Sequence, residues 1–283
     1  MVLFVMADIL ALVFRTFMSK TGLKEDLKVA PPSPTSVGTL LLGDHSVSRS
    51  VLLLAAVTAA ETGMKVMFFT ATPIQSLPAS LQKRIPSVSP ESLKKIKFCY
   101  PCRVEELLQQ LASLHESISM SPTPPSLIII DRLEGYLCSP VGGLTTGFYP
   151  GELSCAAHLS ALLCDTAAFL TQLLKQRSSS SAPCRFIASF QSEVDTGQAG
   201  GEAAATDPIL DVLDRYFQVR CTLDKDRSYE APAAGLQEVW HIFLSGTGNT
   251  QPSCTTDHKD RLSENQEWQL LIFPDGLMEF KLV

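Results

Sequence analysis

The chain has 283 residues, of which 45% are hydrophobic and 18% charged, so it can bury a sizeable core. Its formal charge of −6 and isoelectric point near 5.4 exclude a globally basic coat for nucleic acid or membranes, so any polyanion must bind a local patch. The eight cysteines are too sparse for a disulfide scaffold and are typical of reduced intracellular thiols.

Residues 1–18 form an apolar run that lacks the features of a signal peptide, because no Lys or Arg precedes Arg15 and Asp8 interrupts it. As a membrane span the run is marginal, since a spanning helix needs roughly 20 apolar residues and a central Asp costs about 3 kcal/mol. We favour a loosely attached extension or a partner-binding helix over a membrane anchor. With the proline-containing linker that follows, this extension covers residues 1–36, and the main domain covers 37–283.

From residue 37 onwards, apolar strand-like runs alternate with helical stretches. The expected elements are strands at 37–42, 65–70, 127–131 and 184–192, helices at 49–61, 103–116 and 152–177, and then strands at 216–223, 236–244, 267–273 and 277–283. The last two strands are joined by Pro274-Asp275-Gly276, which is typical of a hairpin turn. We therefore expect one α/β domain whose parallel sheet is extended by a C-terminal antiparallel meander.

The turn after the first expected strand has the setting of a phosphate-binding loop, with an apolar strand before it and an apolar helix after it. The motif G-x-x-x-x-G-K-[ST] surrounds phosphates with backbone N–H groups and a lysine, while its hydroxyl holds Mg²⁺. Gly43 and Ser50 match, whereas Ser48 replaces the second glycine and Arg49 the lysine. The Cβ of Ser48 obstructs a close approach of the backbone, and the guanidinium is wider than an ammonium. Asp44 adds negative charge close to the expected phosphates. The alternative is therefore an ordinary strand–turn–helix that binds no phosphate.

Two later elements favour a nucleotide site. The strand at 127–131 ends in Asp131, which with Ser50 would hold Mg²⁺; alternatively, Asp131 caps the following helix. Ser189, Gln191 and Ser192 end the next expected strand, where they either sense a γ-phosphate or open a loop. Their order along the chain, with the terminal meander, predicts a RecA-like P-loop NTPase core. Its nucleotide-binding residues are Gly43, Ser48, Arg49, Ser50, Asp131 and Gln191.

Several stretches carry a more specific resemblance. They are LLLG at 40–43, residues 93–101 with 105–108, 126–137, 163–168, 215–217, and the terminal strands that contain tryptophan. From about residue 40 to its end, the chain resembles the ATPase-type proteins associated with SWIM zinc-finger proteins. This is a divergent family of RecA-related recombinase paralogues found in the vertebrate Shu complex.

The resemblance implies a nuclear protein of homologous-recombination repair that forms a heterodimer with a SWIM-domain zinc-finger protein. It implies binding to single-stranded DNA, support for filaments of a RecA-family recombinase and its paralogues, zinc in the partner, and ATP with Mg²⁺ as the cofactor. Because the family's phosphate-binding motif is degraded here, ATP binding and hydrolysis are in doubt. RecA-like ATPases also carry a catalytic Glu after the second core strand, where this chain has only Gln75, a poor general base. We predict weak or absent turnover and assign no catalytic residue.

Residues 83–103 concentrate positive charge within the acidic chain, with six basic residues against one acidic residue, Glu91. In the run KKIKFCY, aromatic residues alternate with lysines along an expected strand. Phosphate contacts give salt-dependent affinity, and stacking adds roughly 1–3 kcal/mol per base. We therefore expect single-stranded DNA to bind at Lys94, Lys95, Lys97, Phe98, Tyr100 and Arg103. The alternative is an edge strand with its lysines in water and its aromatic side chains in the core.

Two short motifs have simpler explanations. Phe68 and Ala71 fit the Phe-x-x-Ala pattern by which recombinases dock on one another, but they lie at the end of an expected core strand. Cys99 and Cys102 form a C-x-x-C without a second ligand pair at zinc-like spacing. The leading hypothesis is a repair scaffold with a vestigial nucleotide site. A working DNA-stimulated ATPase and a membrane-associated partner-binding module are the alternatives.

Overall fold

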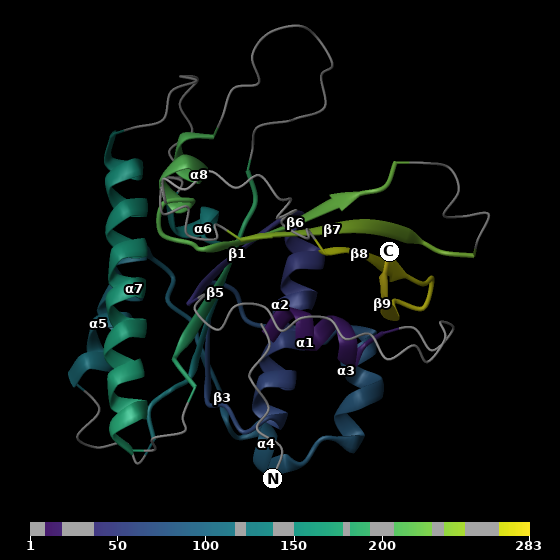
Figure 1. Cartoon of the computed structure of the whole chain (residues 1–283), viewed down its shortest axis with the longest axis horizontal. Helices are drawn as coiled ribbons and strands as arrows, with labels where there is room; N and C mark the ends of the chain where they lie inside the picture. Colours follow the sequence, from purple (N-terminus) through teal and green to yellow (C-terminus); the bar gives the residue numbers. More distant parts are fainter. Residues whose placement is uncertain are drawn as a thin grey trace, which may run out of the picture.

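Nine strands form one sheet within the part of the chain that the computed structural model describes (Figure 1). The described residues are 9–18, 37–116, 123–137, 150–177, 182–192, 207–227, 235–246 and 266–283. The elements are α1 (Ile9–Thr16), β1 (Gly38–Leu42), α2 (His45–Glu61), β2 (Val66–Thr70), α3 (Ala79–Arg84), η1 (Ile85–Ser87), α4 (Pro90–Leu93), β3 (Ile96–Cys99), α5 (Val104–Glu116), β4 (Leu127–Asp131), α6 (Glu134–Leu137), α7 (Pro150–Arg177), β5 (Arg185–Phe190), α8 (Pro208–Leu213), β6 (Val219–Lys225), β7 (Glu238–Gly246), β8 (Gln266–Ile272) and β9 (Met278–Leu282).

The sheet has the order β3-β2-β4-β5-β1-β6-β7-β8-β9, so β3 and β9 are its edges. The first six strands in this order pair in parallel, and β6 to β9 pair antiparallel. The expected parallel sheet with an antiparallel meander is therefore confirmed. The hairpin between β8 and β9 is also confirmed, since the Phe273 amide donates to Leu277 and Gly276 supplies the positive φ of 75°.

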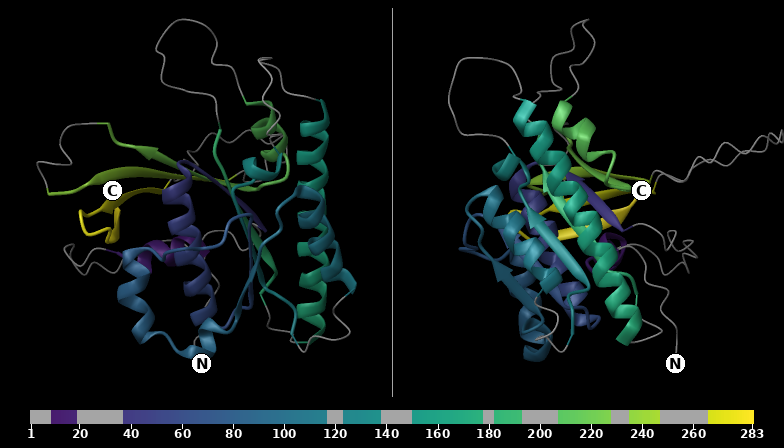
Figure 2. Two further views of the ribbon diagram at one scale, coloured as in Figure 1. Left: turned by 180° about the vertical axis from the view of Figure 1, so that it is seen from behind. Right: turned by 90° about the vertical axis from the view of Figure 1, so that its left-hand side faces the viewer.

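Helices cover both faces of the parallel strands, as Figures 1 and 2 show. One hydrophobic cluster lies under α1 and α2, and the other lies under α5, α7 and α8. Every residue of β1, β2, β4 and β5 is buried, which explains their uninterrupted apolar runs. The edge strand β3 is the exception, since none of its residues is fully buried.

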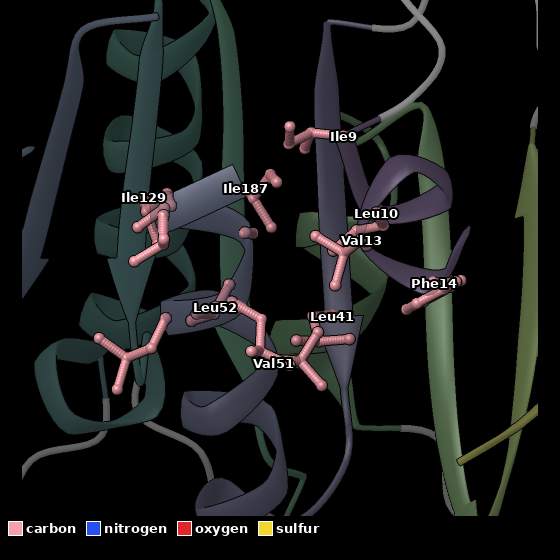
Figure 3. Close-up of a cluster of buried hydrophobic side chains, with 14 of the residues drawn as sticks. Ile9, Leu10, Val13, Phe14, Leu41, Val51, Leu52, Ile129 and Ile187 are labelled. Atoms are coloured by element: carbon pink, nitrogen blue, oxygen red, sulfur yellow. The ribbon is translucent and has the colours of Figure 1, made fainter. Parts of the chain in front are cut away.

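The N-terminal helix α1 belongs to the core. Ile9, Leu10 and Val13 gather beside β1 and α2 in Figure 3, and all three are at most 3% exposed. Phe14 packs between the rings of Phe280 at 4.7 Å and Trp268 at 5.5 Å, between ring centroids. Our expectation of a loosely attached extension is therefore wrong for residues 9–18. The membrane-module alternative also loses its anchor there, since these side chains are buried against protein.

One described helix, α7, is long and apolar enough to cross a membrane by length and composition alone. Its residues Leu159, Leu163 and Leu170 are at most 1% exposed and belong to the cluster beneath α5 and α7. These contacts are those of a helix packed on the face of an α/β sheet.

Candidate functional site

Three buried polar side chains form a row across the carboxyl ends of adjacent strands. Thr70 of β2 lies in register with Asp131 of β4, and Ser189 of β5 lies on the other side of Asp131. All three are at most 3% exposed, and Asp131 is fully buried. The hydroxyls of Thr70 and Ser189 donate to opposite oxygens of the Asp131 carboxylate, at 3.1 and 3.4 Å. Ligands of open α/β sheets bind at this edge, so the row marks the candidate site.

Arg49 of α2 reaches this row and pairs with Asp131. Its Nε lies 2.7 Å from Asp131 Oδ2, and its Nη2 donates to Thr72 Oγ1 at 2.7 Å. A buried carboxylate requires a compensating charge, which Arg49 supplies here. The two residues predicted to grip phosphate and Mg²⁺ are thus brought together, and they bind each other.

Helix α2 begins earlier than its hydrophobic pattern predicts. We expected its start at Arg49, but it begins at His45, leaving only Gly43 and Asp44 between β1 and the helix. Asp44 is the N-cap, and its carboxylate accepts from the backbone N and the hydroxyl of Ser46. These hydrogen bonds, with that from the hydroxyl first, lower the pKa of Asp44. The helix N-terminus thus already holds a carboxylate, at the place where a phosphate-binding loop holds its anion.

The remaining residues of the predicted phosphate loop are helical or engaged with protein. The hydroxyl of Ser50 donates to the carbonyl of Ser46 at 2.9 Å, so the predicted magnesium ligand bonds its own helix. Ser48 is fully buried, and its Oγ has no hydrogen-bond partner in the structure. A Cβ at Gly43 would lie 2.7 Å from the Cβ of Leu223, so this glycine is explained by close packing of β1 against β6.

Gln191, the predicted γ-phosphate sensor, is exposed beyond β5, and its backbone N donates to Glu134 at 3.1 Å. Glu134 also pairs with Arg132, which has a φ of 64° directly after β4. Glu134, Thr70 and Thr72 were not predicted as site residues. The sequence signal that could have found the two threonines is their position at the end of an apolar strand, where Asp131 also lies. No group of three or more His, Cys, Asp and Glu that could hold a metal ion occurs in the described ranges.

The arrangement as a whole does not fit a Mg²⁺–triphosphate. Such a ligand needs a loop with free backbone N–H groups, a basic side chain that is free to reach the phosphates, and a carboxylate that is free to bind Mg²⁺. Here residues 45–50 are helical, Asp44 caps their N-terminus, and Arg49 neutralises Asp131. The charged side chains at this edge of the sheet are therefore already paired with other groups of the protein.

The predicted DNA-binding residues lie on and around the edge strand β3, which pairs with β2. We define the β3 surface as Lys94, Lys95, Lys97, Phe98, Tyr100 and Arg103. Phe98 is 37% exposed and Tyr100 is 44% exposed, although the Phe98 ring also contacts that of Phe68 at 5.3 Å. The alternative of lysines in water is confirmed for Lys94 and Lys97, but that of aromatic side chains in the core is wrong.

Ion pairing divides the six basic residues of this region into two groups. Carboxylates pair with three of them, in the pairs Lys83–Asp275, Arg84–Glu61 and Lys94–Glu91. Lys95, Lys97 and Arg103 form no ion pair with any described residue, so no carboxylate of the described chain neutralises their positive charges. Phe68, by contrast, is fully buried, so burial explains the Phe-x-x-Ala match.

Comparisons with known proteins agree with this architecture. No protein-family model matches the chain. The ATPase SWSAP1 of Mus musculus is 34% identical over 259 residues, which cover 90% of this chain and 74% of the mouse protein. The ATPase SWSAP1 of Homo sapiens is 34% identical over 199 residues, covering 69% of this chain and 73% of the human protein. The crystal structure of the RadB recombinase aligns with a TM-score of 0.51 and 16% identity, covering 86% of this chain and 90% of that chain.

The parallel sheet with its antiparallel extension and the likeness to RadB define an α/β protein with a RecA-like fold. Within that class, the chain belongs to the SWSAP1 ATPase family. The resemblance drawn from the sequence is thereby confirmed.

Proposed function

We propose that this chain is a scaffold of homologous-recombination repair that binds single-stranded DNA through the β3 surface and does not depend on ATP turnover. Its partners would be a SWIM-domain zinc-finger protein and a RecA-family recombinase with its paralogues, and its place of action the nucleus. Membership of the SWSAP1 family and a fold like that of a recombinase support the assignment to recombination.

The observation that carries the DNA-binding proposal is that unpaired basic side chains and exposed aromatic rings lie close together at β3. Lys95, Lys97 and Arg103 have no carboxylate partner among the described residues, while Phe98 and Tyr100 are more than a third exposed. Cations track a phosphate backbone, and aromatic rings stack on bases of any sequence. Single-stranded DNA exposes both its phosphates and its base faces, whereas duplex DNA hides the latter.

Independence from ATP is supported by the candidate nucleotide site. Arg49 and Asp131 neutralise each other, and Asp44 already occupies the N-terminus of α2. A nucleotide would have to displace both contacts before it could bind. A DNA-binding scaffold has no need of that step.

The DNA-binding test uses oligo-dT and the full chain, co-purified with a SWIM-domain protein where that association holds. Lys95→Ala/Lys97→Ala/Arg103→Ala should weaken binding and lower the slope of log K against log salt by about 2, since each lost phosphate contact removes about 0.7. Lys83→Ala is the matched control, because Lys83 is already paired with Asp275. Unchanged affinity in the triple variant would remove the β3 surface from the proposal, and failed co-purification would remove the partner.

A working DNA-stimulated ATPase is the second candidate, favoured by the SWSAP1 relatives, which are named as ATPases, and by the position of Arg49 and Asp131 at the ligand-binding edge. In that case nucleotide with Mg²⁺ would open the Arg49–Asp131 pair. Hydrolysis stimulated by oligo-dT and abolished by Asp131→Asn would establish this candidate over the scaffold.

A further inference from the structure

Thr72 lies in an irregular, exposed segment after the carboxyl end of β2. Residues 71–78 connect β2 to α3 without helix or strand, and Thr72, Pro73, Gln75 and Ser76 are exposed. The residue before a proline favours an extended backbone, and protein kinases bind extended, exposed segments. A threonine directly before a proline is also the acceptor that proline-directed kinases select.

Arg49 places nitrogen donors at the Thr72 hydroxyl. Its Nη2 donates to Thr72 Oγ1 at 2.7 Å, while its Nε donates to Asp131. Its Nη1 donates to no residue in the described ranges. A phosphate on Thr72 would therefore meet unused N–H groups of a guanidinium, the side chain that binds phosphate in bidentate geometry. The Thr72 hydroxyl itself donates to none of the described residues, so no such contact opposes its reaction.

A phosphate attached to Thr72 differs from a free nucleotide in the affinity that it needs. Arg49 already neutralises Asp131, so a free anion gains little at this edge of the sheet. An attached phosphate is held beside the guanidinium at a high effective concentration and needs little affinity of its own. It also leaves the contact between Arg49 Nε and Asp131 in place, because it uses the other nitrogens.

The phosphate would lie beside the β3 surface. β2 and β3 pair in parallel with Phe68 opposite Phe98, and the two rings lie 5.3 Å apart. Phe68 belongs to the cluster under α2, so both rings lie on the face of the sheet that α2 covers. Side chains alternate along a strand, which places Tyr100 on the same face as Phe98. A phosphate on Thr72 therefore adds a charge of about −2 at the edge where Tyr100 emerges.

We propose that Thr72 is a phosphorylation site for a proline-directed kinase, that Arg49 binds the phosphate, and that the phosphate lowers the affinity of the β3 surface for single-stranded DNA. In the transfer, the Thr72 oxygen attacks the γ-phosphorus of ATP, ADP leaves, and the hydroxyl proton passes to the base of the kinase. The added charge repels the DNA phosphates that Lys97 and Arg103 attract. The effect on DNA rests on the proposed function, whereas the phosphate site rests on Thr72 and Arg49 alone.

Phosphatase protection tests the site. The full chain is treated with a purified proline-directed kinase and Mg²⁺–ATP, and mass spectrometry should map a phosphate to Thr72. A phosphatase should remove it at least about 10-fold more slowly than from a synthetic phosphopeptide of residues 66–80, the effect of one charge-assisted hydrogen bond. Ser89 is the matched comparison, because it is exposed, precedes Pro90, and contacts Ser92 but no described arginine through its hydroxyl. Its phosphate should show no such protection relative to its own peptide.

Arg49→Lys distinguishes a phosphate that Arg49 binds from one that the phosphatase cannot reach. Lysine keeps the positive charge but has a single nitrogen, which cannot contact Asp131 and the phosphate together. Protection in this variant should fall to the level of the peptide. Protection that persists in Arg49→Lys overturns the proposal, as does a folded chain that is not phosphorylated at Thr72 when the peptide is. If Arg49→Lys does not fold, equal protection of Thr72 and Ser89 in the unaltered chain contradicts the proposal, and protection of Thr72 alone supports it.

Oligo-dT binding tests the regulation. At low salt, kinase treatment should weaken binding by the unaltered chain about 5-fold more than binding by Thr72→Ala, since Coulomb's law gives this effect for a charge of about −2 at roughly 8 Å from a DNA phosphate in water. The comparison with Thr72→Ala removes the effects of phosphates at other positions. The difference should disappear at about 0.5 M salt, where the charges are screened.

Equal effects of the kinase on the unaltered chain and on Thr72→Ala would contradict the regulation. An untreated chain that does not bind oligo-dT would remove the proposed function and with it the effect on DNA. The phosphatase result would then decide the Thr72 site alone.

Discussion

Arg49 and Asp131 lie 82 residues apart in the chain and meet at 2.7 Å between Nε and Oδ2. In a phosphate-binding fold the residues at these two places serve the ligand, one holding phosphate and the other orienting Mg²⁺. In this chain they neutralise each other. The pair thus lies at the edge of the sheet where ligands of α/β folds bind, and its charges hold α2 against β4.

The Arg49–Asp131 pair should be strongly coupled in stability. Arg49→Met leaves the fully buried carboxylate of Asp131 without a charged partner and should lower the free energy of unfolding by about 3 kcal/mol. A cycle with Asp131→Asn and the double variant, measured by urea denaturation at pH 7, should give a coupling energy of about 2 kcal/mol. Lys94→Ala is the control, because its pair with Glu91 is exposed and should contribute less than about 0.5 kcal/mol. A coupling near zero would show that the two side chains act independently.

Asp44 should stabilise the start of α2 in a pH-dependent way. Asp44→Ala should cost about 1 kcal/mol at pH 7, the usual effect of losing a helix N-cap. Hydrogen bonds from Ser46 hold the pKa of Asp44 below its usual 3.8, so its contribution is present above that value and is lost as the pH falls through the lowered pKa. Urea denaturation at pH 7 and pH 3 should therefore show a smaller difference from the unaltered chain at pH 3.

Asp165→Ala, at an exposed position on α7, is the control for Asp44 and should have little effect at either pH. An Asp44→Ala cost that grows on acidification would contradict the assigned cap.

The aromatic residues of the β3 surface should contribute to DNA affinity independently of salt. Phe98→Ala and Tyr100→Ala should each weaken oligo-dT binding by about 1–3 kcal/mol and leave the salt slope unchanged, because stacking releases no counterions. Fluorescence anisotropy at several salt concentrations measures both quantities. Phe243→Ala provides the comparison, since Phe243 is 39% exposed on β7, far along the sheet from β3. Equal losses from Phe243→Ala and Phe98→Ala would contradict a dedicated surface.

The parallel core could be predicted because its signals are local. The run at Leu127–Asp131 is apolar, short and buried on both faces, and such runs indicate central parallel strands. The start of α2 also had a local signal, since an aspartate before an apolar helix is a typical N-cap. We interpreted Asp44 instead as a charge within a phosphate loop, because the motif G-x-x-x-x-G-K-[ST] places the residue after its first glycine in a loop.

The place of α1 and the Arg49–Asp131 pair could not be predicted in the same way. The apolar side chain of Phe14 finds its partners, Trp268 and Phe280, at the opposite end of the chain. No periodicity in the sequence connects such distant segments. Arg49 and Asp131 were each singled out as nucleotide-site residues, but a motif describes residues that face a ligand and does not reveal that they face each other.

Nucleotide binding by the intact chain tests the central claim most directly. A fluorescent ATP analogue should be titrated with Mg²⁺ into the full protein, with a RecA-type ATPase as the positive control. Arg49 already pairs with Asp131, and the Asp44 carboxylate already lies at the N-terminus of α2. We therefore expect no saturable binding of the analogue below millimolar concentrations. Micromolar binding that is lost in Arg49→Ala would show that the pair opens for a ligand, and would contradict the account.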